Sequence, residues 1–477
     1  MTASPELDIA SLPLPPKNPL PYLRRAKALR SFHTGMDELR DAGGAISRFR
    51  LGPSWLLPQI VVVTSPEGIR DVLAVKDDSI DKTSLVLSEL RRVLGSNLFD
   101  LPYAEWQPRR RTLQPVFTRQ HVRAFGGHMA QAAERVAAGW VDGATVNLDD
   151  ECRQLTLNAL GRSVLGLDLS DHAEVIADPL RESLTYVADR SLRPVRAPRW
   201  LPTRAGRRAQ RASATLHELA YDILRRCRTD PDTDAPLVQA LLAATDPETG
   251  NALTDQEIAD ELIVFLFAGH DTTATTLTYA LWALGRHPDI QARVAQEAAA
   301  LPDRPLEPDD VAELSYTVQV LKESLRLCPP GPTGTRMATR DVVVNGYRVP
   351  AGTMVIFGRL AVQRDPTLWH DPLAFDPDRF GPEQSRERNR WQYIPFGGGP
   401  RSCIGDHFAM LEATLGLATL VRRAEIHSLE ADFPLAVPFT MVAGGPIPVR
   451  IQRRSPTQQP PPDGVRPDVD DHDMENK

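Results

Sequence analysis

Cysteine is scarce in this sequence, with four residues in a chain of 477. Cys152, Cys227, Cys328 and Cys403 stand far apart, whereas a structural zinc site needs several ligands at short spacing and a small secreted domain needs closely placed pairs. This usage argues against a disulfide framework and predicts a protein of a reducing compartment. We expect that compartment to be the cytoplasm.

Long apolar runs are also missing. The longest is 262–268, which follows Glu261 and ends at Gly269, whereas a helix that spans a bilayer needs about 20 apolar residues. Residues 1–45 carry prolines and charges but no signal peptide. We therefore expect a soluble protein without a transmembrane anchor.

Basic charge is not in excess, because 55 Lys and Arg against 62 Asp and Glu give a net charge of −7. This balance argues against nucleic acid as a partner. Two nucleotide-binding patterns are absent as well. No Lys-Ser/Thr follows the glycines at the spacing of a phosphate-binding loop, and no Gly-x-Gly-x-x-Gly follows a predicted strand. The sequence therefore predicts no flavin module.

The sequence does have a glycine-rich loop at 396–405, with the letters FGGGPRSCIG. Its glycines and proline exclude the interior of a helix or strand. The loop brings Cys403 to the start of an apolar helical pattern over 408–420, where free N–H groups and the helix dipole stabilise a thiolate. A thiolate in this position suits an axial ligand to iron.

Other roles for Cys403 stay open on this pattern alone. An inert core thiol is the usual fate of a lone cysteine. A nucleophile needs a base, for which His407 is the nearby residue. A zinc ligand needs companions that the other cysteines are too distant in sequence to supply. The choice depends on whether the rest of the chain supplies a haem site.

The pattern Phe396-x-x-Gly399-x-Arg401-x-Cys403-x-Gly405 resembles the haem-binding signature of the cytochrome P450 family. Three further motifs agree with the family in order and spacing, and the resemblance covers about residue 40 to about residue 452. It implies a mainly α fold with a smaller β region, haem b as the cofactor and Cys403 as the ligand of its iron. Phe396 is expected to pack near the sulfur and to tune the potential of the iron.

Four residues are implied as partners of the haem carboxylates. Trp106 and Arg110 stand four apart on a predicted helix, and therefore on one face. Arg336 precedes a predicted hairpin, and Arg401 belongs to the signature. A guanidinium group suits a carboxylate because its donors form a fixed fork. A solvated basic face is the alternative for the run 109–111.

A capping box at Thr254 begins a helix that we expect to reach about Arg286. Its middle is unusual, because Gly269, Asp271 and Thr272 interrupt an apolar pattern. The resemblance implies that dioxygen binds there over the iron, with Thr272 and Asp271 as the catalytic residues. Thr272 would donate a hydrogen bond to the bound oxygen, and Asp271 would relay protons. A polar seam between helices is the alternative.

Two further features concern the fold. Glu323 and Arg326 resemble the family's Glu-x-x-Arg pair, which Arg379 of a later loop completes as a buried triad that holds the cysteine loop. Gln363 departs from the family, in which histidine is common at this position. We expect no mechanistic consequence from this departure.

Three sections are expected along the chain. They are a flexible Pro-rich arm at 1–21, a single catalytic domain at 22–454 and a disordered acidic tail at 455–477. Residues 22–42 have a continuous helical pattern. Residues 76–104 lack a clear period, and in the resembled family this region covers the substrate.

The function implied is that of a monooxygenase, which inserts one oxygen atom of O2 into a small, largely apolar organic substrate. We expect a monomer that receives electrons from a ferredoxin and its flavin-dependent reductase, with the arginines at 109–111 and those around Cys403 on the docking face. A peroxygenase, an isomerase or dehydratase, and a non-catalytic haem sensor are the alternatives. Asp271 and Thr272 favour the monooxygenase because O–O cleavage needs delivered protons.

Overall fold

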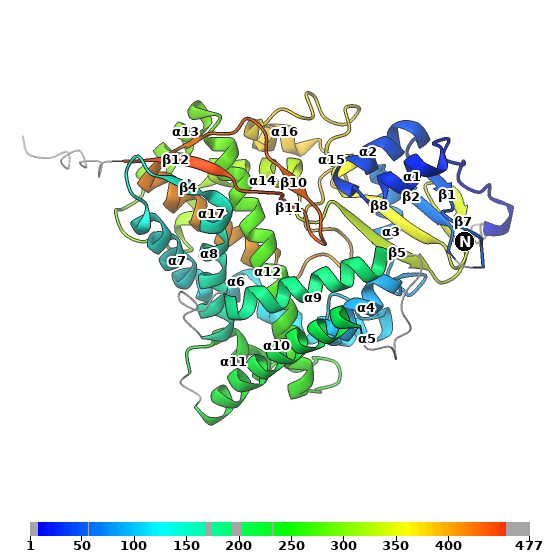
Figure 1. Cartoon of the computed structure of the whole chain (residues 1–477), viewed down its shortest axis with the longest axis horizontal. Helices are drawn as coiled ribbons and strands as arrows, with labels where there is room; N and C mark the ends of the chain where they lie inside the picture. Colours follow the sequence, from blue (N-terminus) through cyan, green and yellow to red (C-terminus); the bar gives the residue numbers. More distant parts are fainter. Residues whose placement is uncertain (1–7, 56, 167–173, 193–202, 231–232, 455–477) are drawn as a thin grey trace, which may run out of the picture.

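The computed structural model describes residues 8–55, 57–166, 174–192, 203–230 and 233–454. Helices fill the left and lower parts of the view in Figure 1, and the largest sheet lies at the right, near the N-terminal residues. The fold is mainly α with a smaller β region, which confirms the expected class. The predicted acidic tail and residues 1–7 lie outside the described residues.

The largest sheet has five strands in the order β1-β2-β8-β5-β3. The neighbours pair antiparallel except β2 and β8, which run parallel. Alternate side chains of β2 enter two separate cores, one shared with helix α3 and one with helix α2. In sheet order, the strands are β1 (Ile46–Phe49), β2 (Ile60–Val63), β8 (Met354–Gly358), β5 (Thr333–Ala338) and β3 (Ile80–Asp81).

Three smaller sheets complete the β structure. A three-stranded sheet joins distant segments in the order β4-β12-β9, and two hairpins pair β6 with β7 and β10 with β11. The bounds are β4 (Thr145–Asn147), β12 (Pro448–Arg453), β9 (Ala424–Ser428), β6 (Val342–Val344), β7 (Tyr347–Val349), β10 (Leu435–Ala436) and β11 (Val442–Ala443).

Helices make up most of the remaining structure. None of those described is long and apolar enough to span a bilayer. In chain order, they are α1 (Tyr22–Ala28), α2 (Phe32–Gly43), α3 (Pro66–Leu73), α4 (Leu85–Leu94), α5 (Tyr103–Leu113), α6 (Arg119–Val122), α7 (Gly126–Gly139), α8 (Leu148–Leu160), α9 (Glu174–Leu192), α10 (Arg204–Thr229), α11 (Pro236–Ala243), α12 (Asp255–Leu284), α13 (Pro288–Ala299), α14 (Ser315–Leu327), α15 (Arg359–Gln363), α16 (Pro382–Arg386) and α17 (Asp406–Arg423).

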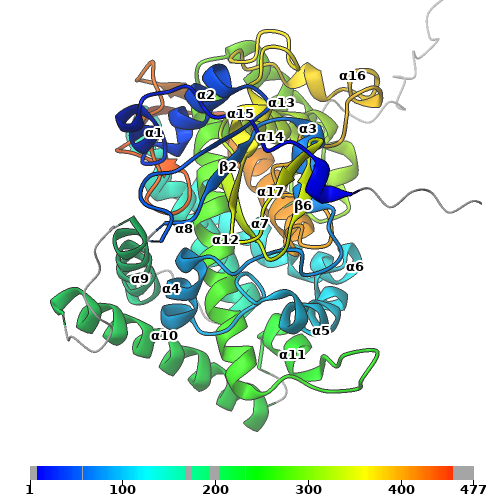
Figure 2. The ribbon, with the colours of Figure 1, turned by 90° about the vertical axis from the view of Figure 1, so that its right-hand side faces the viewer.

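Helix α12 is the axis of the helical part. Its 30 residues span about 45 Å at 1.5 Å per residue, and Figure 2 shows it running through the molecule. The predicted capping box is confirmed, because Thr254 accepts from the backbone N–H of Glu257 and the Glu257 side chain accepts in return. Helices α8, α10, α14 and α17 pack against α12, so its polar middle is held inside the fold.

The N-terminal region differs from the expectation in two ways. Backbone N–H groups of Arg48 and Arg348 donate to the carbonyl groups of Pro16 and Pro13, at 2.8 and 2.9 Å. Residues 8–21 are therefore tied to the β region, in place of the flexible arm expected there. The continuous helical pattern of 22–42 is divided into α1 and α2, which are separated by residues 29–31.

Carboxylates of α12 hold part of region 76–104, which has no clear hydrophobic period in the sequence. After α4, the N–H of Ser96 donates to Asp260 at 2.8 Å, and the N–H of Leu98 donates to Glu261 at 2.9 Å. Burial raises the pKa of Glu261 to about 7, against the opposing charge of Arg109. Part of region 76–104 is therefore fixed to the central helix by buried hydrogen bonds.

We expect Gly95→Ala to destabilise the protein by about 2 to 3 kcal/mol, because only glycine readily adopts this backbone conformation. Gly95 has φ 79° and ψ −180°, and an added Cβ would lie 2.1 Å from a carboxylate oxygen of Asp260. The measurement is the shift of the urea unfolding midpoint.

Gly127→Ala is the matched control, since an added Cβ there meets nothing within 4 Å. We expect it to stabilise α7 by about 0.5 to 1 kcal/mol. Equal stability of the Gly95→Ala protein and the wild type would contradict the role assigned to Gly95.

Candidate active site

The cysteine loop is closed by its own backbone. The N–H of Cys403 donates to the carbonyl of Phe396 at 2.8 Å, and the N–H of Gly397 donates to the carbonyl of Ile394 at 2.9 Å. Gly399 has φ 68°, and a Cβ on it would lie 1.9 Å from the carbonyl oxygen of Leu73. The loop therefore needs glycine where it packs against the end of α3. Helix α17 begins three residues after Cys403.

Cys403 differs from the other three cysteines, which are buried, because its side chain is exposed. Enough protein still surrounds the sulfur for burial to raise the pKa of the thiol. The N–H of Gly405 and the charges of Arg110 and Arg359 oppose this rise without reversing it. A thiol of raised pKa is a poor free nucleophile at neutral pH, whereas a bound metal ion deprotonates it.

These observations disfavour three alternatives for Cys403. An inert core thiol would be buried, and Cys403 is not. The only ion pair of His407 within the described chain is with Asp406, and no described residue forms a hydrogen bond to the cysteine as a base. The described residues contain no group of three or more metal-binding side chains. A protein-only zinc site is therefore unsupported here.

A surplus of positive charge gathers beside the loop. Burial lowers the pKa of Lys82, and the charges of Arg336 and Arg401 lower it further. The charge of Arg401 also lowers the pKa of Arg336. Burial and its cationic neighbours lower the pKa of Arg336 to about 9. The paired carboxylate in this group is Asp81, 2.7 Å from Arg401. The arrangement can accept further negative charge.

Helix α5 supplies the two residues that sequence spacing placed on one face. Arg110 donates to the carbonyl of Ser402 at 3.0 Å, directly before the cysteine. The ring of Trp106 lies under the guanidinium group of Arg401, at 4.7 Å. Among the described residues, none accepts a hydrogen bond from the Trp106 indole. Trp106, Arg110 and Arg401 therefore meet, and the indole N–H remains available to a ligand.

The neighbouring arginines of α5 point elsewhere. Arg109 is buried and pairs with Glu257 and Glu261 of α12. Arg111 pairs with Asp246 at 3.0 Å and with Glu248. Consecutive helical residues differ by about 100° in direction, so Arg109, Arg110 and Arg111 each meet different partners. Arg109 is buried and so cannot belong to a docking face, whereas for Arg111 this role stays a prediction.

The middle of α12 is less buried than the stretches on either side of it, and this less buried part is the polar stretch noted in the sequence. Ala268, Gly269, Asp271 and Thr272 are partly exposed within an otherwise buried stretch of the helix. The Thr272 hydroxyl donates to the carbonyl of Ala268 at 2.6 Å, as hydroxyl residues in helices can. No described contact joins these residues to the cysteine loop directly, but α12 packs against α17.

Asp271 is not a free carboxylate in this structure. It forms an ion pair with Arg153 of α8, which also bonds Asp149 at 2.7 Å. The preceding His270 is buried and contacts the hydroxyl of Thr156 at 2.9 Å. Burial lowers the pKa of His270 to about 4, so its ring is neutral at physiological pH. Sequence spacing gave no sign of either partner.

Three aromatic rings from separate segments meet beside this part of α12. Phe439, in the turn between β10 and β11, lies 5.6 Å from the ring of Phe267 and 6.4 Å from that of Phe99. Phe267 directly precedes Ala268 on α12, and Phe99 belongs to the segment held by Glu261. We call these three residues the aromatic wall. Phe267 lies four residues, about one helical turn, before Asp271, so the two share one face of α12.

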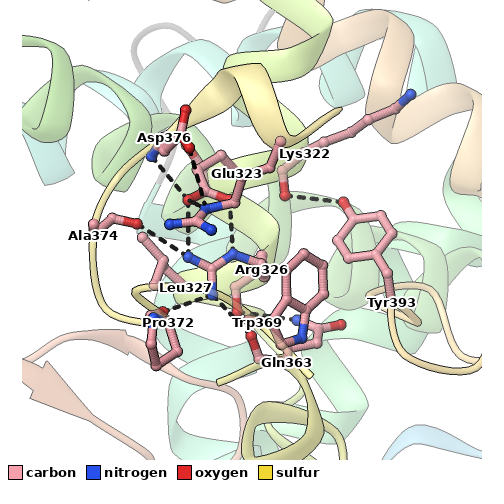
Figure 3. Close-up of polar contacts among 12 residues, drawn as sticks. Lys322, Glu323, Arg326, Leu327, Gln363, Trp369, Pro372, Ala374, Asp376 and Tyr393 are labelled. Atoms are coloured by element: carbon pink, nitrogen blue, oxygen red, sulfur yellow. Dashed lines mark hydrogen bonds and ion pairs between the residues drawn. The ribbon is translucent and has the colours of Figure 1, made fainter. Parts of the chain in front are cut away.

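The predicted structural triad is confirmed. Arg326 is fully buried and forms two bonds to Glu323, at 2.7 and 2.8 Å, as Figure 3 shows. Arg379 approaches the same carboxylate at 3.4 Å. Arg326 also donates to the backbone carbonyl groups of Gln363, Pro372 and Ala374. The triad therefore organises backbone and does not touch Cys403.

A family model described as Cytochrome P450 matches residues 13–450. This chain belongs to the cytochrome P450 family. It is a P450 monooxygenase, and its cofactor is haem b.

Named relatives and a solved structure agree with this assignment. The chain is 31% identical to "Cyclooctat-9-en-7-ol 5-monooxygenase" of Streptomyces melanosporofaciens, over 87% of this chain and 89% of the relative. It is 33% identical to "Pentalenene oxygenase" of Streptomyces avermitilis, over 82% and 86%. The crystal structure of the cytochrome P450DA haem domain matches with a TM-score of 0.79 at 24% identity, covering 93% of this chain and 98% of that one.

The residues present fit the haem. Arg336, Arg401 and Lys82 offer cations for its two carboxylates, and burial lowers the pKa values of all three in their absence. Arg359 has a buried Nε without a hydrogen-bond partner, and its charge reaches Cys403. Cys403 offers an exposed thiol near Arg110 and Arg359. Asp81, Lys82 and Arg359 were missed in the sequence, because no spacing links them to the signature.

We expect Arg336→Met to weaken haem retention, because it removes one charged donor while leaving packing against Phe357, whose ring lies 5.6 Å from the guanidinium group. The rate of haem transfer to excess apomyoglobin should rise about tenfold, the effect of losing a charged hydrogen bond.

Arg340→Met is the control, since Arg340 is exposed and pairs with Asp77 and Asp78. Equal transfer rates for the two variants would show that Arg336 does not hold the haem.

Proposed function

We propose that this P450 inserts one oxygen atom of O2 into a cyclic terpene or terpene alcohol. The observation that carries the proposal is the aromatic wall beside Asp271 and Thr272 of α12. Its rings suit an apolar substrate, which gains about 25 cal/mol per Å² of apolar surface removed from water. The names of two relatives, a cyclooctatenol monooxygenase and a pentalenene oxygenase, support the cyclic terpene class.

Haem supplies, when bound, the iron at which dioxygen is activated, and we propose Cys403 as its ligand. Trp106, Arg110, Arg336 and Arg401 hold the haem carboxylates in this proposal, and the cationic surplus described above supports it. Phe396 accepts the hydrogen bond from the Cys403 N–H and so orients the ligand.

The catalytic residues are Thr272 and Asp271 in this proposal. The Thr272 hydroxyl, now bonded to the Ala268 carbonyl, donates to the reacting oxygen after a rotation about its side-chain bond. Asp271 takes protons from the solvent side and passes them toward Thr272. Its ion pair with Arg153 holds the carboxylate in a fixed position.

The proposed electron donors are a ferredoxin and its flavin-dependent reductase. P450 monooxygenases use O2 and redox partners, which supports separate electron donors. We further propose that the chain acts as a monomer in the cytoplasm. Four cysteines without a disulfide support a reducing compartment.

The test is turnover of pentalenene and cyclooctat-9-en-7-ol under ¹⁸O2, with a ferredoxin and its reductase. We expect a product with one added ¹⁸O atom that forms only when both electron donors are present, and no turnover of a linear fatty acid. The reduced carbon monoxide complex should show the red-shifted Soret band of thiolate ligation, and Cys403→Ser should abolish it.

Each other outcome overturns part of the proposal. A product that forms from peroxide without O2 or donors supports the peroxygenase alternative. A thiolate band without any product from the terpenes would refute cyclic terpenes as the substrate class. A folded protein that takes up haem but lacks the band removes Cys403 as the ligand.

We expect Phe439→Ala to weaken binding of the cyclic terpene about tenfold, because an aromatic side chain contributes about 1.5 to 3 kcal/mol when an apolar substrate covers it. The substrate-induced spin-state shift of the haem measures this affinity. Phe433→Ala is the control, since Phe433 packs 5.1 Å from Tyr279 and away from the wall. Equal affinities in both variants would exclude the aromatic wall from the substrate site.

A further inference from the structure

Gln363 is the last residue of α15, and its side chain is fully buried. Its amide Nε2 donates to the carbonyl groups of Leu325 and Arg326, at 2.9 and 3.1 Å. Its Oε1 accepts from the backbone N–H of Ile394 at 3.1 Å. One side chain therefore joins the end of α14 to the segment that begins the cysteine loop.

The two carbonyl groups belong to the last turn of α14, where a helix has no backbone donors of its own to offer. Leu327, the next residue, receives a donor from Arg364. Gln363 and Arg364 together satisfy three successive carbonyl groups at this buried helix end. A side chain without donors at position 363 would leave two of them unpaired.

The bond to Ile394 fixes the backbone at the start of the cysteine loop. Ile394 accepts from the N–H of Gly397, and Phe396 accepts from the N–H of Cys403. The backbone of Gln363 is also fixed, because Arg326 donates to its carbonyl at 2.9 Å. Figure 3 shows Gln363 beside Arg326 in this network. The position of the cysteine loop is thus coupled through one amide to the buried triad.

An amide group suits this site better than an imidazole. The three contacts require two N–H donors and one acceptor, and a glutamine amide supplies all of them in one plane. Neutral histidine supplies one donor and one acceptor, and its cation supplies two donors and no acceptor. The expectation that the departure at Gln363 has no mechanistic consequence did not take these three bonds into account.

We propose that Gln363 is a positioning residue for Cys403, which sets the place of the cysteine loop relative to the buried triad. The inference rests on the proposed role of Cys403 as the haem ligand. Gln363 touches neither the cofactor nor the substrate, and it acts through the backbone of Ile394.

The chain contains a matched control. Gln291 of α13 is also buried, and it makes the same three kinds of bond away from the cysteine loop. Its Nε2 donates to the carbonyl groups of Leu284 and Ile426, at 3.1 and 3.0 Å, and its Oε1 accepts from the N–H of Ile426 at 2.8 Å. Gln291→Leu should therefore cost as much stability as Gln363→Leu without moving Cys403.

The experiment compares Gln363→Leu, Gln363→His, Gln291→Leu and the wild type as haem-loaded proteins. The readouts are the urea midpoint, the reduction potential of the haem iron, and the rate at which the carbon monoxide complex loses its thiolate Soret band. We expect both leucine variants to lower the midpoint similarly. Only Gln363→Leu should lose the band about tenfold faster than the wild type and shift the potential.

Gln363→His should lie between the wild type and Gln363→Leu, and it keeps the test valid if Gln363→Leu does not fold. Equal rates of band loss in Gln363→Leu and Gln291→Leu would reduce Gln363 to a stabilising residue and overturn the proposal. A wild-type protein without the thiolate band would instead refute Cys403 as the ligand, so the two failures are distinguishable.

Discussion

The fold of the catalytic region depends on one buried charge. Arg326 has no exposed surface, and its guanidinium group must be fully paired, because breaking a buried ion pair costs about 3 to 5 kcal/mol. Two bonds to Glu323 neutralise it, and the remaining donors go to three backbone carbonyl groups of a long connection. Because the guanidinium group of Arg326 must be fully paired, the backbone at Gln363, Pro372 and Ala374 must pass close to it. The cysteine loop follows this stretch of backbone in the chain.

In the described part of the chain, buried arginines of this network are paired with carboxylates, whereas Arg336 beside the cysteine loop is not. Arg326 and Arg109 meet carboxylates of the chain itself. Arg336 has no carboxylate partner among the described residues, and burial depresses its pKa to about 9. A cation left in this condition is costly to the protein alone. A carboxylate bound beside Arg336 would offset this cost, which supports the proposed contact between Arg336 and the haem.

Local signals in the sequence were sufficient for several parts of the structure. The capping box at Thr254 and the glycine pattern around Cys403 depend on neighbouring residues, and both were predicted from spacing. The partners of the arginines could not be predicted in this way. Asp81 and Arg401 are separated by 320 residues, and Arg109 and Glu261 by 152. Only the folded chain decides which carboxylate each guanidinium group meets.

The hydroxyl groups of α12 have a consequence for its backbone. Thr272, Thr275, Thr276 and Thr278 each donate to the carbonyl four residues earlier. Side-chain bonds of this kind slightly destabilise a helix and often bend it. All four lie within residues 272–278, so this half of α12 is where the long helix is most easily bent.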